Sequence, residues 1–458
     1  MTNLKKLDKS NRKSNSKSQD QENAKRTKSL RHKALFAVLV CLLLAFFWTG
    51  GIVGFANSMA QNAIASQRLD SADWWLNVSR SISSSNALSD FLQARTERKR
   101  GNLDKMSNHL KVAFKKGFDP RRLDREQDLA AASLGRLTKE VEDRLNLWLE
   151  GPNAEVGEII DSYANGLTAV SRFDNAMELL KVWEENAPWE PVANYRIARI
   201  NEHLSRATEA EAQYKKAIEK DRKYQKATYN LARVLLDQKR PEEALKFFQS
   251  CNSGASALAA KTGMARCYKT FGETEKARTL LHEVLKSSYQ DLLDSYRCMD
   301  EIPERFVAAS ELGILETELG DFAVARKYLE IALKVHPLDS IARYSYAVAL
   351  RGLRLQKEAE ENFAITRAAR ASLDQVTVLQ EVLRKDLQDT QSRIMIGKIV
   401  LEHESERTGL FWLQSVFSYD PTNSEAHEAI ASFFESKKDM TPEDKKRAAY
   451  HRSFVTKK

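Results

Sequence analysis

The chain has 458 residues, of which 29% are charged, and it contains only 17 Gly and 9 Pro. This composition is typical of long helices and argues against a β-sandwich or barrel, and the length exceeds one compact core unless the fold stacks repeats. The formal net charge of +9 is unevenly placed, because residues 1–33 hold eight Lys and three Arg against three acids. The remaining 425 residues carry only +1, so nucleic-acid binding loses its main support.

Two segments precede the predicted repeats. Residues 1–33 are rich in Lys, Ser, Asn and Gln and have few large apolar side chains, so we expect a disordered basic tail. Residues 34–56 run for 23 positions without a charge, which is long enough for a transmembrane signal-anchor helix. The basic tail would stay in the cytoplasm and leave the later residues outside it. A cleaved signal peptide is the alternative, because Ala56 and Ala60 lie at offsets that suit a signal peptidase.

A repeat of 34 residues organises the centre of the chain. The segments 191–224 and 225–258 match at the positions where two packed helices must approach closely. Small residues recur at unit positions 8, 20 and 27 and an aromatic residue recurs at position 24; the pairs are Ala198 and Ala232, Ala210 and Ala244, Ala217 and Cys251, and Tyr214 and Phe248. Small residues let the helices of a hairpin cross closely, and the aromatic ring fills the space beside the crossing.

This spacing resembles that of the tetratricopeptide repeat (TPR), and the resemblance extends in steps of about 34 residues over most of the chain. It implies an all-α fold, namely a right-handed α-solenoid of TPR-type helical hairpins following a single transmembrane helix. We expect the interruption at 374–389 to lengthen the helix before it. The predicted segments are degenerate TPR-like hairpins at 57–156, central units at 157–291, an interrupting segment at 292–305, units at 306–373, a helical interruption at 374–389, and C-terminal units with a capping helix at 390–458.

The candidate binding site is a stripe on the first helices of the central units. TPR structures place unit positions 2, 5, 9 and 12 along a concave groove, and position 9 here is arginine in three successive units. The predicted groove residues are Arg199, Arg233, Arg266, Tyr195, Tyr229 and Asn230. Guanidinium groups interleaved with aromatic rings can bind carboxylates bidentately, which favours acidic partner segments. The alternative is a solvated face whose arginines pair with Glu202, Glu209 and Glu211.

Other reactive side chains give weaker signals. The chain has no phosphate-binding loop, no H-E-x-x-H, no C-x-x-C and no G-x-S-x-G, so we expect no catalytic residue, no cofactor and no metal. His403, His427 and His451 lie near the C-terminus but not at ligand spacing. Cys251 and Cys267 are expected to be neighbours, either bonded as a disulfide in an oxidising compartment or present as small buried residues.

These features predict a scaffold and not an enzyme. The leading hypothesis is a bacterial inner-membrane protein, single-pass with a cytoplasmic N-terminus, that contacts the lipid bilayer through residues 34–56 and binds partner proteins or peptides through its extracytoplasmic TPR groove. No nucleic acid and no small-molecule substrate are expected. The alternatives are an assembly chaperone for secretion or cytochrome maturation, and a mitochondrial outer-membrane import receptor with a cytosolic TPR domain. Only Asn230 matches the carboxylate clamp of one TPR subset in the window that starts at 191, which weighs against the import receptor.

Overall fold

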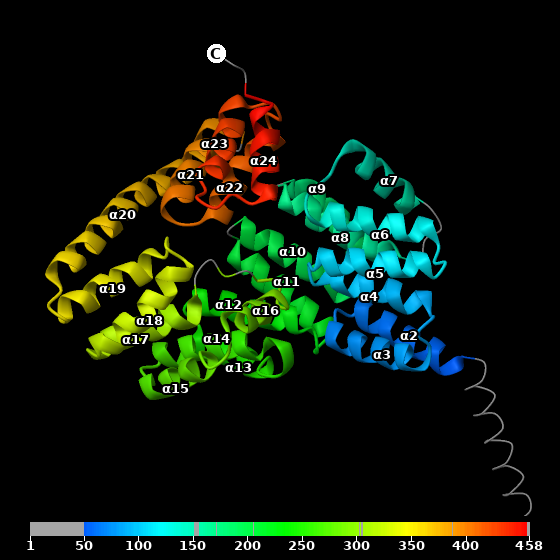
Figure 1. Ribbon diagram of the computed structural model, residues 1–458, viewed down its shortest axis with the longest axis horizontal. Coiled ribbons are helices and arrows are strands. Elements are labelled where there is room, and N and C mark those ends of the chain that lie inside the picture. The colour runs from blue at the N-terminus through cyan, green and yellow to red at the C-terminus, as the bar shows by residue number, and fades with distance from the viewer. Residues whose placement is uncertain are drawn as a thin grey trace, which may run out of the picture. The chain divides into compact units, whose positions relative to one another are not determined.

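The structure is a computed structural model that describes residues 50–150, 155–170, 172–204, 206–301, 303, 306–386 and 388–455. Within these ranges every regular element is helical, with 23 α-helices, two short 3-10 helices and no strand (Figure 1). The prediction of an all-α fold of helical hairpins is therefore confirmed. The chain divides after Leu123 into two compact units, which are described separately.

The first unit contains two helical hairpins. Its helices are α2 (Gly51–Ala65), α3 (Leu69–Ile82), α4 (Ala87–Lys99) and α5 (Leu103–Lys115), and α2 packs on α3 as α4 packs on α5. The buried side chains of α2 include Val53, Ala56, Ala60 and Ala63, whose spacing of three to four residues puts them on one face. A buried polar contact joins the hairpins, because the Ser89 hydroxyl lies 2.7 Å from the Ser79 hydroxyl.

The predicted membrane anchor needs correction. The tail at 1–33 and residues 34–49 of the anchor lie outside the described residues, and the described end of the anchor belongs to α2, a 15-residue helix packed on α3. Among the described residues, none of the helices is long and apolar enough to cross a bilayer. As far as the structure describes the chain, the predicted single-pass inner-membrane localisation is wrong.

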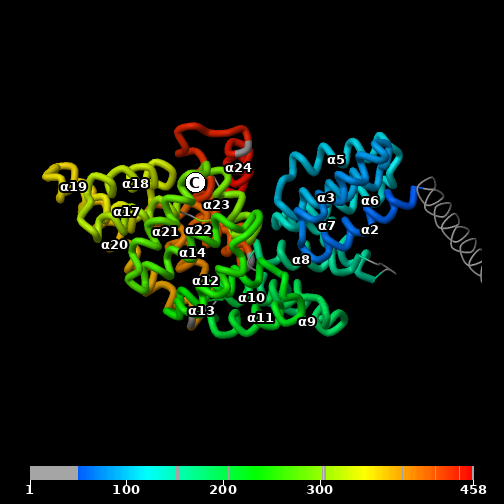
Figure 2. The backbone as a smooth tube through the Cα atoms, turned by 90° about the horizontal axis from the view of Figure 1, so that it is seen from below, coloured from blue at the N-terminus to red at the C-terminus, as the bar shows by residue number. Residues whose placement is uncertain are grey.

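The second unit is a longer series of hairpins, whose backbone is traced in Figure 2. Its helices are α6 (Pro120–Ser133), α7 (Lys139–Glu150), α8 (Val156–Ala169), α9 (Phe173–Asn186), α10 (Pro191–His203), α11 (Ala207–Lys220), α12 (Gln225–Asp237), α13 (Pro241–Ser250), α14 (Ala257–Thr270), α15 (Thr274–Val284), α16 (Tyr289–Arg297), α17 (Val307–Leu319), α18 (Phe322–Val335), α19 (Ser340–Gly352), α20 (Gln356–Lys385), α21 (Thr390–His403), α22 (Glu406–Ser415), α23 (Ser424–Glu435) and α24 (Pro442–Arg452). The 3-10 helices are η1 (Gly254–Ser256) and η2 (Val416–Ser418).

Close helix crossing at small residues holds each hairpin together. In the α17–α18 hairpin, a Cβ added to Gly313 would lie 2.4 Å from Cγ of Leu329, so only glycine fits there. Ala325 and Ala332 of α18 are fully buried at the same interface. Gly320 ends α17 with a φ of 82°, in the left-handed region that glycine adopts without strain. The 34-residue spacing therefore sets both the crossing and the turn.

Two departures from the simple repeat shape the second unit. A single helix, α16, lies between the α14–α15 and α17–α18 hairpins, and α20 extends to 30 residues before α21 begins. The C-terminal helices come back to the middle of the stack, where α22 lies beside α9 and α10 (Figure 1 and Figure 2). There the Phe411 ring contacts Phe173 and His203, with centroid distances of 6.4 and 5.8 Å.

Ala325→Leu should destabilise the second unit, because three extra carbons must enter a filled helix crossing. We expect a loss of about 1–3 kcal/mol in the free energy of unfolding, measured from urea midpoints. Lys327→Leu on the exposed side of the same helix is the control and should change the midpoint little. Equal small effects from the two variants would show that the helix register is wrong.

Candidate functional site

The predicted arginine stripe lies on the first helices of three successive hairpins, α10, α12 and α14. Arg199 and Arg233 come together around shared acids, since each forms an ion pair with Glu202 and with Glu301. Arg266 pairs with neither of these acids. It lies 3.5 Å from Glu311 and 3.8 Å from Asp237, and Asp237 also pairs with Arg233 at 3.7 Å. The structure thus brings two of the three arginines into one cluster.

A turn of the chain itself occupies this part of the groove. It follows α16 and belongs to the interrupting segment predicted at 292–305. The N–H of Glu301 donates to Tyr296 O at 3.0 Å and the N–H of Asp300 donates to Arg297 O at 3.0 Å, which is a Schellman cap on α16. Asp300 takes the left-handed position of the cap, with a φ of 56°, where glycine is usual. We call Met299, Asp300 and Glu301 the acidic turn.

Asp300 is bound through its carboxylate to α10 and α12. Lys226 Nζ lies 2.7 Å from Oδ1, while Arg196 Nη1 and the Tyr195 hydroxyl donate to Oδ2 at 3.3 and 3.1 Å. Burial raises the pKa of Tyr195, so its phenol stays protonated and remains a donor. Arg196 also donates to Asp161 of α8 at 2.7 Å, which links the turn to a third helix.

Glu301 and the turn backbone complete the contact. Arg199 Nη1 donates to Oε1 of Glu301 at 2.5 Å, and Arg233 Nε lies 3.4 Å from the same oxygen. Asn230 donates to the main-chain carbonyl of Met299 at 2.9 Å. The predicted residues Arg199, Arg233 and Asn230 therefore bind both a carboxylate and the backbone of an acidic segment, which is the chain's own.

Acids and cations alternate in the cluster. Its ion pairs join five acids to four cations, namely Asp161, Glu202, Asp237, Asp300 and Glu301 to Arg196, Arg199, Lys226 and Arg233. Burial alone would raise the pKa of Asp300, but Lys226 and Arg196 hold that pKa below its ordinary value. Burial opposes ionisation of Glu301 in the same way, and the charge of Arg199 holds its pKa below the ordinary value. Both acids of the turn are therefore ionised at neutral pH.

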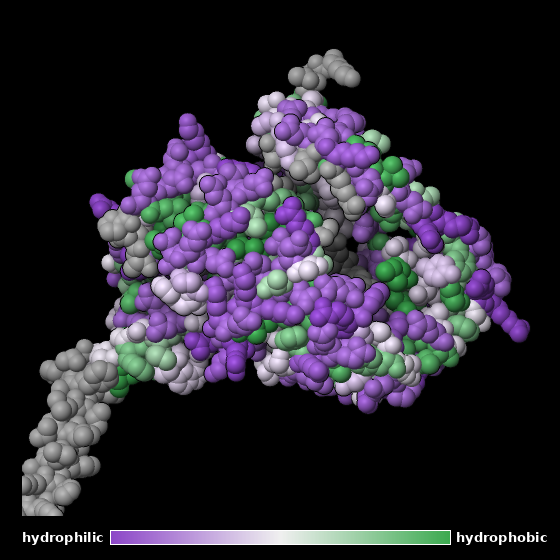
Figure 3. All heavy atoms as spheres, turned by 180° about the vertical axis from the view of Figure 1, so that it is seen from behind, coloured by the Kyte–Doolittle hydropathy of each residue, from purple (hydrophilic) through white to green (hydrophobic). Residues whose placement is uncertain are grey.

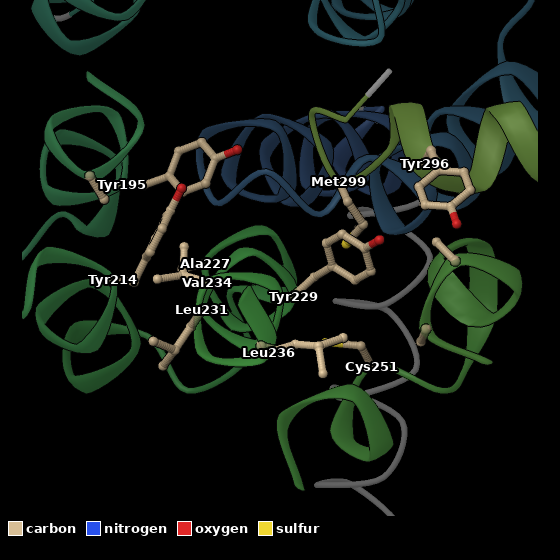
Figure 4. Close-up of a cluster of buried hydrophobic side chains, with 14 of the residues drawn as sticks. Tyr195, Tyr214, Ala227, Tyr229, Leu231, Val234, Leu236, Cys251, Tyr296 and Met299 are labelled. Atoms are coloured by element: carbon tan, nitrogen blue, oxygen red, sulfur yellow. The ribbon is translucent and has the colours of Figure 1, made fainter. Parts of the chain in front are cut away.

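The predicted aromatic residues are buried beneath the turn. Figure 4 shows Tyr229 of α12 beside Met299, with Tyr296 of α16 next to it, and Tyr195 beside Tyr214. The ring centroids of Tyr229 and Tyr296 are 6.4 Å apart. Tyr195 and Tyr229 are thus core residues in this arrangement, and a partner could reach them only after the acidic turn had moved.

The sequence analysis missed the acids that the groove binds and two of the cations. Asp300 and Glu301 lie in a segment that the repeat spacing identifies only as an interruption. Glu301 is 102 residues from Arg199 in the sequence. Lys226 stands at unit position 2, one of the groove positions, but was not selected, and Arg196 was not selected either. The usable signal was the pair of adjacent acids within an interruption that follows the basic units.

Four of the cysteines and histidines named in the sequence analysis, Cys251, Cys267, His427 and His451, lie outside this site. Cys251 and Cys267 are both buried free thiols, and burial raises the pKa of Cys251 to about 11 and that of Cys267 to about 12. The structure therefore gives them as thiols and places no disulfide between them. His427 and His451 are in contact, with Nδ1 to Nδ1 at 2.8 Å, but no group of three metal-ligating side chains occurs among the described residues.

Comparison with known proteins identifies the class. Two tetratricopeptide repeat family profiles match the chain, one over residues 203–250 and one over residues 311–375. With the stacked hairpins, these matches define a helical repeat protein of the TPR type. The chain therefore contains tetratricopeptide repeats within these two segments. No curated protein sequence matches it.

Solved structures similar to the chain share helical repeats at low identity. PilW, a type IV pilus biogenesis factor, is 17% identical with a TM-score of 0.40, covering 47% of this chain and 94% of PilW. YrrB, a TPR protein with an unusual peptide-binding site, is 19% identical with a TM-score of 0.27, covering 47% and 96%. A human IFIT1 dimer with m7Gppp-AAAA is 14% identical with a TM-score of 0.41, covering 87% and 93%. We draw no function from these likenesses.

Neutralising the acidic turn should destabilise the second unit in a pH-dependent way. Asp300→Asn with Glu301→Gln keeps the shape of both side chains. It removes the charged partner of Lys226 and leaves Arg196 paired with Asp161 and Arg199 with Glu202. We expect a loss of about 1–3 kcal/mol at pH 7, measured from urea midpoints. The pKa of both acids is lowered in the folded state, so their contribution is complete above about pH 4 and is lost as the pH falls through the folded values.

The difference in the free energy of unfolding between this variant and the wild type should therefore become smaller below about pH 4. Asp294→Asn, at an exposed acid on α16, is the matched control and should be nearly silent at every pH. A difference that stays constant from pH 7 to pH 3 would contradict the ion-pair assignment.

Proposed function

We propose that this TPR protein is a non-enzymatic scaffold that binds acidic segments of partner proteins in the groove of α10 and α12, in competition with its own acidic turn. The observation that supports this is the double recognition of Asp300 and Glu301. Arg199, Arg233 and Lys226 bind carboxylates, while Asn230 binds a main-chain carbonyl. Any extended or turning segment with adjacent acids offers the same groups.

Charge favours an acidic occupant over a neutral one. Without the acidic turn, Asp161, Glu202 and Asp237 would face Arg196, Arg199, Lys226 and Arg233, which leaves an excess of one positive charge. Partly buried cations without partners are costly, so the groove would attract carboxylates strongly.

The internal occupant is also under backbone strain. Asp300 holds a left-handed conformation that costs a non-glycine residue about 1 kcal/mol. A partner segment that brings two carboxylates without this conformation avoids that cost. Competition between the turn and a partner is therefore feasible on energetic grounds.

The test uses a fluorescein-labelled peptide with the sequence of residues 288–301 and Cys298→Ser, titrated with the full chain and followed by fluorescence anisotropy. The wild type should bind it weakly, because its own turn competes. The variant with Asp300→Asn and Glu301→Gln should bind it at least tenfold more tightly. Raising the salt from about 0.05 to 0.3 M should weaken the binding, because screening reduces attraction between charges.

Adding Arg199→Gln and Arg233→Gln to the neutralised variant should abolish the binding. Arg222→Gln with Lys223→Gln is the matched control, because both residues are exposed between α11 and α12. Circular dichroism should show equal helicity in the two sets. If the neutralised variant remains helical and binds the peptide no better than the wild type, the turn is a fixed part of the core and the proposal is wrong.

A further inference from the structure

The hairpin of α19 and α20 lacks the neighbour that earlier hairpins have. In the preceding repeat, α19 packs on both α17 and α18. The next helix in the chain, α21, begins only after the extension of α20 and packs along α20. The interruption at 374–389 therefore moves α21 away from the place where the first helix of the next repeat would lie.

The effect of the missing neighbour can be seen by comparing side-chain exposure at equivalent repeat positions of α17 and α19. Val307 and Ile341 stand 34 residues apart in register, yet Val307 is 9% exposed and Ile341 is 58% exposed. Ser310 is fully buried, whereas its equivalent Tyr344 is 56% exposed. In each pair the residue on α19 is also the larger one: isoleucine replaces valine, and tyrosine replaces serine. The repeat thus presents, on α19, the kind of residue that it buries one unit earlier.

Ile341 and Tyr344 line a groove of about 990 Å³ between α19 and residues 356–377 of α20. Its floor includes Phe363, whose ring lies 5.6 Å from that of Tyr344 and beneath the guanidinium of Arg351 at 5.2 Å. In the space-filling view, apolar side chains interrupt the polar surface at the end of the molecule that α19 and α20 form (Figure 3). The apolar part of the lining consists of Ile341, Tyr344, Ala359, Phe363 and Leu373, and polar or charged side chains make up the rest.

The groove is lined by charges of both signs. Three arginines and two acids line it, and Glu360 pairs with Arg367 at 2.6 Å. Arg351, Arg370 and Asp374 remain, with an excess of one positive charge. A ligand that complements this surface has an apolar stripe and acidic residues beside it.

We propose that the α19–α20 groove is a docking site for an amphipathic α-helix of a partner protein, with an apolar stripe flanked by acids, seated where the first helix of the next repeat would pack. In the preceding repeat, α19 packs on α17 and α18 at the equivalent place. The surface of α19 and α20 therefore has a shape on which a helix can pack. This site is separate from the groove of α10 and α12, and its occupancy does not depend on the acidic turn.

A displayed library of 16-residue amphipathic helices, randomised at the positions beside a fixed apolar stripe, would test the proposal against the full chain. Selected helices should carry acids beside the stripe and gain helicity on binding, as measured by circular dichroism. Ile341→Glu with Tyr344→Glu should weaken their binding at least tenfold. Both side chains are more than half exposed, so the chain should keep its fold.

Ile365→Glu is the matched control, because Ile365 is an exposed apolar residue of α20 that does not line the groove, and it should leave binding unchanged. Arg370→Glu should weaken the acidic helices more than neutral variants of them. Selected helices that are insensitive to the Ile341 and Tyr344 substitutions would overturn the proposal. So would a chain that dimerises by light scattering and becomes monomeric with those substitutions, because a second copy would then fill the groove.

Discussion

Neutralisation of charge between the basic first helices and the acidic turn is the interaction on which the centre of the second unit depends. Arg199 and Arg233 belong to helices one repeat apart, and carboxylates between them make their approach favourable. Glu202 supplies one carboxylate from α10 itself, while Glu301 comes from the end of α16. A repeat stack ordinarily joins each unit to its neighbours alone. Here the turn joins α10 and α12 to a helix that follows α15, so these hairpins are tied together across the groove.

The hairpins could be predicted because their determinants are local. Positions such as Gly313, Ala325 and Ala332 recur with the repeat, and each acts on a partner only one helix away. The return of α22 to α9 and α10 could not be predicted in this way. It depends on contacts such as that between Phe411 and His203, which no spacing within one repeat encodes. An uncharged run was likewise insufficient to assign a membrane helix, since its described end is part of the packed helix α2.

The basic half of the candidate site could be predicted from the sequence for the same reason, but its acidic half could not. The stripe of Arg199, Arg233 and Asn230 follows from repeat position, and the attraction to acidic groups follows from the side-chain chemistry. The identity of the acids required knowledge of where the interruption after α15 folds. Tyr195 and Tyr229 show the consequence, because at groove positions they would face solvent or a ligand. Instead, Met299 and Tyr296 lie against Tyr229, and the Tyr195 hydroxyl donates to Asp300. A pattern of positions defines a surface, but the insertions decide whether that surface is open.

Both interruptions of the register act on neighbouring surfaces, in opposite directions. The segment around α16 brings a cap with two acids into the groove of α10 and α12 and closes it. The segment after residue 373 instead prolongs α20, so that α21 no longer covers α19, and Ile341 and Tyr344 are left exposed. The first insertion folds back and fills the groove of α10 and α12, whereas the second continues α20 and leaves the groove of α19 and α20 unfilled. The repeats supply equivalent surfaces, and the two insertions make one of them a self-occupied site and the other an unoccupied one.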